Sequence, residues 1–151
     1  MIKSLNIVIA GVGGQGTLVA GKLFGTLALR TGMDVKVSEV HGMSQRGGSV
    51  ITFVRMGEKV YSPVIEKGGA DFILTFEELE ALRYADHLSS DGKIIINTRQ
   101  IIPVTIKINK SSVYPDDIPG MLQRAGTGGS GVISVDADAL AAKAGNIKAA
   151  N

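Results

Sequence analysis

Cysteine is absent from the chain, and aromatic residues are scarce. The absence of cysteine excludes a disulfide scaffold, a thiolate zinc site, a cysteine nucleophile and an iron–sulfur cluster held by this chain. Aromatic residues make up 5% of the sequence, and 16 lysines and arginines nearly balance 14 aspartates and glutamates, for a net charge of +2. No run of like charge is longer than two residues. Without a basic stripe, the composition gives no support to a nucleic-acid-binding protein.

Long apolar runs are also missing. None approaches the roughly 18 to 20 residues of a membrane-spanning helix. The first residues lead straight into the apolar run Leu5–Ala10, so no signal peptide is visible. We therefore expect a cytoplasmic protein with no membrane partner. A chain of 151 residues suits a single domain over residues 1–151, in which about two thirds of the unfolded surface becomes buried.

Glycine, by contrast, is abundant. It accounts for 20 of 151 residues, about 13%, compared with about 7% in average proteins. The glycines follow no collagen period, and a mean hydropathy of +0.22 is too high for a disordered chain. Thirteen of the 20 lie within residues 1–75. The first half of the chain is therefore where we expect backbone conformations that other residues disfavour.

Apolar periodicity predicts alternating strands and helices, and hence an α/β domain with a mainly parallel sheet. The expected strands are 5–10, 34–40, 50–56, 59–61, 70–74, 93–97 and 132–135. The expected helices are 17–31, 75–87, 116–124 and 137–144. The Gly57-Glu58 link predicts a β-hairpin between 50–56 and 59–61. The segment 101–114, with a proline inside it, is expected to form one or two short edge strands.

Acidic residues at helix starts have a structural explanation. Thr75-Phe-Glu-Glu78 matches a capping box, and Asp136 is placed to cap the last helix. The pair Asp116 and Asp117 also lies at the start of a predicted helix. We therefore assign no metal site to these carboxylates. Asp91-Gly92 is expected to turn the chain into the strand 93–97.

The predicted helix 17–31 is unusually apolar. Its strongly polar residues, Lys22, Thr26 and Arg30, follow one another every fourth position and form a single narrow stripe. Such a helix is expected to bury more than one face. Gly21 and Gly25 would let another backbone approach closely, either that of this chain's own sheet or that of a partner subunit.

A Gly-x-Gly-x-x-Gly pattern at 11–16 lies directly between a predicted strand and a predicted helix. In this setting the turn can aim backbone amides at an anion near a helix N-terminus. Glu39, at the end of the second strand, is a candidate for binding a ribose hydroxyl. Three interpretations stay open: a dinucleotide site, a purely structural turn, or a site for an anionic group of another ligand or of a partner's cofactor. The candidate cofactor-binding residues here are Gly11, Gly13, Gly14, Gln15 and Gly16.

The segment 41–49 combines an imidazole, an amide, a guanidinium and two hydroxyls with three glycines and no acid. It follows a strand at the edge where the first glycine turn is expected. Such a loop can approach a phosphate or carboxylate, with Arg46 able to pair in bidentate fashion, or it can be an ordinary solvated loop. The candidate cofactor-binding residues in it are His41, Ser44, Gln45, Arg46, Gly47, Gly48 and Ser49. No catalytic residue is assigned, because His41 has no visible partner.

Four motifs in order carry a resemblance to a known family. They are Gly11-Val-Gly-Gly-Gln-Gly16, the segment from Ser38 to Ser49, Val60-Tyr-Ser-Pro63, and Glu77-x-x-Glu80-Ala-Leu-Arg83. Together they resemble the gamma-type subunit of 2-oxoacid:ferredoxin oxidoreductases, and within that group the subunit that serves indolepyruvate. The resemblance implies a three-layer, Rossmann-like domain working inside a larger complex.

The resemblance also implies a division of labour. In such complexes thiamine diphosphate decarboxylates a 2-oxoacid, iron–sulfur clusters pass electrons to ferredoxin, and coenzyme A takes the acyl group. The thiamine and iron–sulfur sites belong mainly to an alpha-type partner subunit, so this chain is expected to bind no cofactor tightly by itself. By the same resemblance, the turn 11–16 and the loop 41–49 are expected to face the partner, its cofactor or coenzyme A. The alternative function is a stand-alone dinucleotide-binding or regulatory module.

The C-terminal residues 145–151 resemble the opening of a longer helical tail in that family. We therefore expect the chain to be shorter at this end than its relatives.

Overall fold

The computed structural model describes residues 4–42, 47–109, 112–125, 131–146 and 150. Six strands form one sheet in the order β2-β3-β1-β4-β5-β6. The strands are β1 (Ser4–Val12), β2 (Asp34–His41), β3 (Ser49–Gly57), β4 (Ala70–Thr75), β5 (Leu88–Asn97) and β6 (Val132–Val135). The helices are α1 (Thr17–Arg30), α2 (Glu78–Tyr84), a 3₁₀ turn (Ala85–His87), α3 (Val104–Ile108), α4 (Ile118–Arg124) and α5 (Ala137–Lys143).

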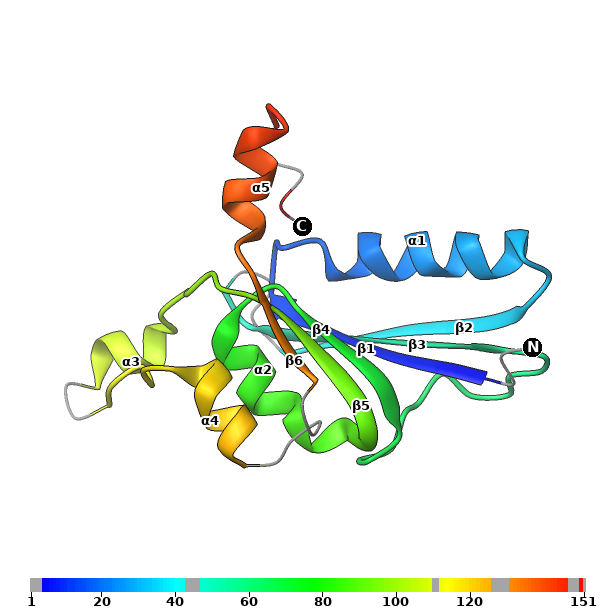
Figure 1. The fold of residues 1–151 in the computed structure, drawn as a ribbon, viewed down its shortest axis with the longest axis horizontal. Helices are drawn as coiled ribbons and strands as arrows, with labels where there is room; N and C mark the ends of the chain where they lie inside the picture. Colours follow the sequence, from blue (N-terminus) through cyan, green and yellow to red (C-terminus); the bar gives the residue numbers. More distant parts are fainter. Residues whose placement is uncertain (1–3, 43–46, 110–111, 126–130, 147–149, 151) are drawn as a thin grey trace.

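The described part of the chain has three layers. Helix α1 lies along one face of the sheet, while α2 and α4 cover the other face (Figure 1). Helix α5 follows β6 and projects away from the sheet (Figure 1). The expected three-layer α/β class with a mainly parallel sheet is confirmed; the sheet also contains a hairpin, formed by β2 and β3. None of the described helices is long and apolar enough to cross a membrane.

Strand β3 interrupts the parallel pattern. The pairs β1–β4, β4–β5 and β5–β6 are parallel, whereas β3 is antiparallel to both β1 and β2. Strands β1 and β2 consequently run in the same direction, and β3 fills the gap that the crossover through α1 leaves between them. This arrangement differs from the uninterrupted parallel order of a dinucleotide-binding half-domain.

The predicted hairpin between 50–56 and 59–61 is wrong, because residues 59–61 form no strand. The hairpin of this fold is β2–β3, with Asp34 opposite Gly57 and His41 opposite Val50. Both edges of β3 are already paired over its length, so no edge is left for a strand that follows it. The chain instead leaves the sheet after Gly57, where the Val60 amide donates to Asp34 Oδ2 at 2.9 Å.

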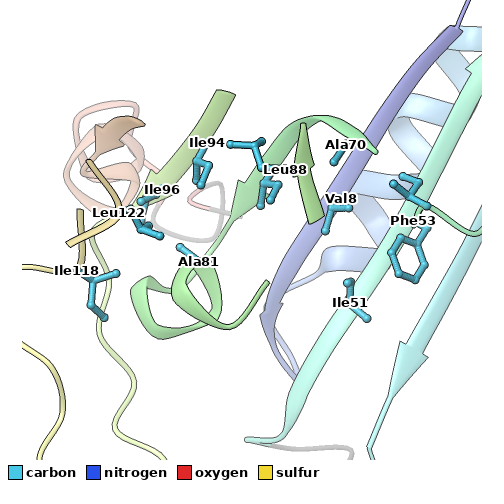
Figure 2. Close-up of a cluster of buried hydrophobic side chains, with 12 residues drawn as sticks. Val8, Ile51, Phe53, Ala70, Ala81, Leu88, Ile94, Ile96, Ile118 and Leu122 are labelled. Atoms are coloured by element: carbon cyan, nitrogen blue, oxygen red, sulfur yellow. The ribbon is translucent and has the colours of Figure 1, made fainter. Parts of the chain in front are cut away.

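The hydrophobic core lies on both faces of β1. Val8 and Ile9 are both fully buried, Val8 toward α2 and Ile9 toward α1, which confirms the strand buried on two faces. The cluster on the α2 and α4 side, drawn in Figure 2, includes Ile73, Ile94, Ile96, Ile118 and Leu122. The cluster on the α1 side is smaller and consists of Ile7, Ile9, Ala28, Val54, Met56 and Phe76.

Two further expectations about local structure are wrong. The segment 101–114 contains the short helix α3 in place of edge strands. Residues Asp91 and Gly92 lie inside β5, beside a register shift, and do not form a turn. A Cβ at Gly92 would approach the Ala70 carbonyl to 2.8 Å, so this glycine serves close strand packing.

The N-terminus of α2 is also displaced from its expected position. Thr75 is the last residue of β4, and its buried hydroxyl has no hydrogen-bond partner among the described residues. The N-cap is Glu77, whose Oε2 accepts from the Glu80 amide at 3.0 Å. The parallel pairing of β4 with β1 continues to Thr75, which holds that residue in strand conformation and delays the helix. By contrast, the capping roles expected at the starts of α4 and α5 are confirmed, with Asp117 and Asp136 as N-caps.

Candidate functional site

The glycine turn between β1 and α1 leaves the N-terminus of a 14-residue helix without a side-chain cap. The N-cap is Gly16, in the left-handed region at φ 80°, and Gly14 has a φ of 102°. The first turn of α1 contains no acidic residue. Backbone amides at such a terminus favour an acceptor or an anion, and the helix dipole adds to the effect.

The second glycine-rich segment lies against this turn. The Gly13 amide donates to the Gly48 carbonyl at 2.8 Å, and Ser49 pairs with Val12 in the β1–β3 ladder. The structure therefore brings the two predicted segments together, as the sequence indicated. Three of the predicted site residues, Ser44, Gln45 and Arg46, lie outside the described residues.

A cleft of about 320 Å³ opens beside the turn. Its lining consists of Gly13, Gly14, Gly16, Thr17, Leu18, Glu39, His41 and Val50. Glu39 Oε2 accepts hydrogen bonds from the Thr17 and Thr52 hydroxyls at 3.2 and 3.3 Å. The exposed imidazole of His41 has its Nδ1 3.1 Å from the Gly42 carbonyl oxygen.

The cleft therefore combines two kinds of polar group. The first turn of α1 offers amide donors, and Glu39 offers carboxylate lone pairs. A ligand that carries both an anionic group and hydroxyl groups matches this combination better than a bare phosphate, which Glu39 would repel. The lining residues Thr17, Leu18 and Val50 were not predicted from the sequence, because they carry no recognisable motif of their own.

Two of the predicted residues, Gly11 and Gln15, lie inward of the cleft. Gln15 is buried; its Oε1 accepts from the Val12 amide at 2.7 Å, and its Nε2 donates to the Phe76 carbonyl at 2.9 Å. A Cβ at Gly11 would lie 3.0 Å from Gln15 Oε1 and 3.1 Å from Thr17 Cγ2, so the glycine makes room for both side chains.

The position of Gln15 matters because β1 and β4 form the switch point of the sheet. From β1 the chain crosses toward β2, and from β4 it crosses to the other side toward β5. Ligands of open α/β sheets commonly bind in the crevice at such a point. Here the Gln15 amide bridges Val12, the last residue of β1, and Phe76, the residue after β4.

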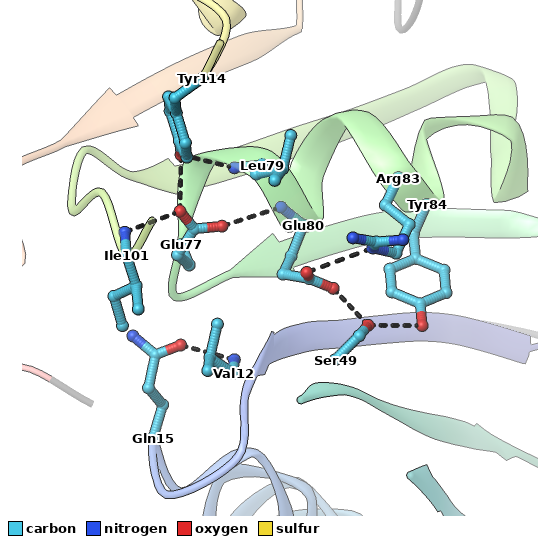
Figure 3. A network of polar contacts seen from close by, with 10 residues as sticks. All are labelled: Val12, Gln15, Ser49, Glu77, Leu79, Glu80, Arg83, Tyr84, Ile101 and Tyr114. Carbon is cyan, nitrogen blue, oxygen red and sulfur yellow. Dashed lines mark hydrogen bonds and ion pairs between the residues drawn. The ribbon is translucent and has the colours of Figure 1, made fainter. Parts of the chain in front are cut away.

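A buried polar network connects the loop 41–49 with α2 (Figure 3). The Ser49 hydroxyl donates to Glu80 Oε2 and lies 2.9 Å from the Tyr84 hydroxyl. Arg83 Nε donates to Glu80 Oε1 at 3.2 Å. Burial raises the pKa of the Glu80 carboxyl above its usual range, although the Ser49 hydrogen bond and the Arg83 charge act in the opposite direction.

A second buried carboxylate, Glu77, connects the segments around the N-terminal end of α2 (Figure 3). Glu77 Oε1 accepts from the Ile101 amide at 3.0 Å and from the Tyr114 hydroxyl, which in turn accepts from the Leu79 amide at 3.1 Å. Burial, reinforced by the Glu77 hydrogen bond and charge, raises the pKa of Tyr114 well above its usual range. The tyrosine therefore stays a neutral donor to Glu77. From the sequence, these glutamates stood out only as part of the motif 77–83.

The mixed sheet, the glycine turn at α1 and the switch point bridged by Gln15 together define a Rossmann-like α/β domain. This domain differs from a simple dinucleotide-binding fold. The model of the pyruvate ferredoxin/flavodoxin oxidoreductase family matches residues 6–151. The chain belongs to this family.

Sequence comparison with curated proteins identifies similar subunits. The chain is 47% identical to the indolepyruvate oxidoreductase subunit IorB of Thermococcus kodakarensis, over 99% of this chain and 74% of that protein. It is 45% identical to IorB of Pyrococcus horikoshii, with the same coverage. These matches confirm the resemblance to a gamma-type subunit that the motifs indicated.

Solved structures show the same fold. The pyruvate oxidoreductase subunit PORC of Thermotoga maritima superposes with a TM-score of 0.67 at 22% identity, covering 98% of this chain and 71% of that one. A 2-oxoglutarate:ferredoxin oxidoreductase from Magnetococcus marinus superposes with a TM-score of 0.66 at 18% identity, covering 98% of this chain and 22% of that one.

Proposed function

We propose that this chain is a subunit of a 2-oxoacid:ferredoxin oxidoreductase that acts on indolepyruvate. In the proposed reaction, indolepyruvate and coenzyme A give carbon dioxide, the acyl-coenzyme A and a proton, and the two electrons released reduce two ferredoxins. The identity of 47% and 45% to two indolepyruvate oxidoreductase subunits, over 99% of this chain, is the observation that carries the proposal. On this proposal the chain acts as one gamma-type domain in the cytoplasm.

The residues of this chain indicate how the chemistry would be divided. The sequence has no cysteine to ligate an iron–sulfur cluster. The described residues also contain no group of three or more histidine, aspartate and glutamate side chains able to hold a metal ion, such as the one that a thiamine diphosphate would need. The iron–sulfur clusters and thiamine diphosphate, which carries out the decarboxylation when bound, would therefore belong to an alpha-type partner subunit.

The cleft beside α1 is the proposed contribution of this chain to the assembled site. Coenzyme A carries phosphates and a ribose, which match the combination of the amide donors in the first turn of α1 with the Glu39 carboxylate. The proposed binding residues remain those predicted from the glycine turn and the loop 41–49, with Gly13, Gly14, Gly16 and His41 lining the cleft itself. In this proposal they bind and orient an anionic group of coenzyme A or of the partner's cofactor.

Reconstitution with the partner subunit tests this function. The complex should reduce ferredoxin only when indolepyruvate and coenzyme A are both supplied. Arg46→Ala and Gln45→Ala should each lower this activity or assembly, while Lys107→Ala, an exposed position on α3, should not. Unchanged activity and assembly in both loop variants would show that the loop 41–49 does not contribute to the site. A wild-type complex without indolepyruvate activity would overturn the proposed substrate.

A stand-alone dinucleotide-binding module is the second candidate, favoured by the position of Glu39 in the cleft at the helix N-terminus. Two features weigh against it: Gln15 bridges the switch-point crevice, and β3 takes the place of a parallel strand. Titration of the isolated chain with NAD(H), NADP(H), FAD and coenzyme A separates the candidates. Tight binding of a dinucleotide by the isolated chain would favour the second one.

A further inference from the structure

The outer face of α1 carries large aliphatic side chains that nothing in the described chain covers. Val19, Leu23 and Leu27 follow one another every fourth residue and are 71%, 70% and 54% exposed. Leu18 and Leu29 lie on the other flank of the same face and are 38% and 66% exposed. Neighbours at this spacing form a continuous ridge on a helix. We call the outward side of α1, formed by these five residues with Lys22, Thr26 and Arg30, the α1 outer face.

The inward side of the same helix is already packed against the sheet. Gly21 and Gly25 lie against the sheet, where a Cβ at Gly21 would come within 2.8 Å of Thr52 Cγ2. Gly25 lies over Val37. The glycines therefore bring α1 close to this chain's own sheet, and the apolar outer face needs a different explanation. A clustered apolar surface of this kind marks an interaction site in soluble proteins.

The charges of the α1 outer face restrict what can cover it. Lys22 and Arg30 flank the aliphatic ridge, both are exposed, and neither forms an ion pair with any described residue. The helix contains no aspartate or glutamate. A second copy of α1 packed on this face would bring lysine and arginine against their own kind with no carboxylate to balance them. The charge pattern therefore favours a different chain whose apolar surface is bordered by carboxylates.

The α1 outer face is also continuous with the cleft. Leu18 belongs to both, because it lines the cleft and lies on the exposed flank of α1. A chain that covers the face would therefore reach the glycine turn as well. We propose that the α1 outer face is the docking surface for the thiamine- and iron–sulfur-binding partner subunit, through an apolar patch rimmed by acidic residues. This inference rests on the proposed function and names the surface by which the chain joins the complex.

Co-expression of the full chain with the partner subunit provides the test. Leu23→Glu should lower the amount of partner that co-purifies, and should weaken its affinity at least ten-fold. Ile108→Glu is the matched control, because Ile108 is 77% exposed on α3, away from α1. The charge contribution is tested separately by the double reversal Lys22→Glu with Arg30→Glu, for which Lys107→Glu is the control. The double reversal should weaken assembly most at low salt.

Thermal unfolding of each isolated variant, followed by circular dichroism, distinguishes a folding defect from an interface defect. Exposed positions on a helix tolerate glutamate, so the variants should melt within a few degrees of wild type. Assembly that survives both sets of α1 changes would overturn the inference while leaving the proposed function intact. Failure of the wild-type chain to assemble with the partner would instead overturn the proposed function.

The wild-type chain and the Leu23→Glu variant also test two other possible binding partners of the α1 outer face. A wild-type chain that dimerises alone, and that Leu23→Glu makes monomeric, would assign the α1 outer face to a second copy. Binding to anionic phospholipid vesicles that Leu23→Glu abolishes would assign it to a membrane surface. Either result would overturn the inference. The supporting result is a wild-type chain that is monomeric alone, does not bind vesicles, and loses its partner on substitution of α1.

Discussion

Helices α1 and α2 cover opposite faces of the same sheet, and they are held there by different means. Helix α1 contacts the sheet where side chains are missing, since Gly21 and Gly25 allow it to lie close to β2 and β3. Helix α2 is fixed by buried carboxylates: Glu77 and Glu80 are 1% and 3% exposed, and both accept several hydrogen bonds. The first arrangement depends on shape and the second on hydrogen-bond partners.

Helix α2 therefore organises the interior of the chain, whereas α1 presents side chains to the outside. The polar residues of α2 are used within the chain, where they hold the segments around Ser49, Ile101 and Tyr114. The apolar residues of α1 are left over after its own packing is complete. Four substitutions, in order of decreasing expected effect on the free energy of unfolding, test how the two helices are held.

The largest loss of stability is expected from Glu77→Ala. The change removes the acceptor of the Ile101 and Glu80 amides and of the Tyr114 hydroxyl, and leaves these donors without a partner in a buried place. The free energy of unfolding, measured in urea, should fall by about 4 kcal/mol. Glu77→Gln keeps an acceptor oxygen and should cost less than half as much. Equal losses in the two variants would show that the charge, and not the hydrogen bonding, holds α2.

Gly21→Val is expected to have the next largest effect, on the opposite face. The added side chain would overlap Thr52 and Val37, and would lift α1 from the sheet at a cost of about 3 kcal/mol. Gly25→Ala is the matched control, because a Cβ there would lie 3.6 Å from Val37, an ordinary contact. It should stabilise the chain by about 0.5 kcal/mol through helix propensity. Urea unfolding of both variants measures the difference, and a destabilising Gly25→Ala would contradict the packing described for α1.

A smaller loss is expected from Tyr114→Phe. The change removes one donor to Glu77 and the acceptor of the Leu79 amide, while the aromatic ring stays. A loss of about 1.5 kcal/mol is expected in the same unfolding measurement. Combined with Glu77→Ala it should add little, because both changes remove the same hydrogen bond. Full additivity would indicate that the two residues act independently.

The smallest effect concerns the pH dependence of Glu80. Burial raises the pKa of this carboxyl in the folded chain above its ordinary value of 4.5. The folded state then binds a proton more readily than the unfolded state, so the contribution of Glu80 to stability falls as the pH rises above 4.5. The stability of wild type relative to Glu80→Gln should therefore decline with rising pH and level off above the raised pKa. Urea unfolding at a series of pH values measures this, and a difference that grows with pH would contradict the burial effect.

Much of the chain was predictable from local patterns. The apolar run of β1, the helix of α1 and the capping aspartates of α4 and α5 each depend on residues close together in the sequence. The candidate site was predictable in part, because both glycine-rich segments follow strands that end at the same edge of the sheet. Glu39, which lines the cleft, was also predicted as a binding residue from its position at the end of the second strand.

The wrong predictions concern segments in which pairing with strands far away in the sequence outweighs the local conformational preference of the residues. The segment 59–61 has a strand-like sequence after a turn-like Gly57-Glu58, but β3 has no free edge to pair with it. Thr75 suits a helix cap, yet its pairing within the sheet holds it in β4. Likewise, nothing local to Ser49 and Glu80 indicates that they meet, because 31 residues separate them and only the docking of α2 brings them together.

The amino-acid sequence alone was enough to identify the fold class, the family and the glycine-rich segments, because these depend on composition, periodicity and motifs. The sequence also shows that the chain offers no cysteine ligand for an iron–sulfur cluster. Three features are apparent only in the folded chain: β3 lies between β1 and β2, Gln15 bridges the switch point, and the α1 glycines face this chain's own sheet. Each of these depends on which surfaces remain unpaired after the sheet has formed.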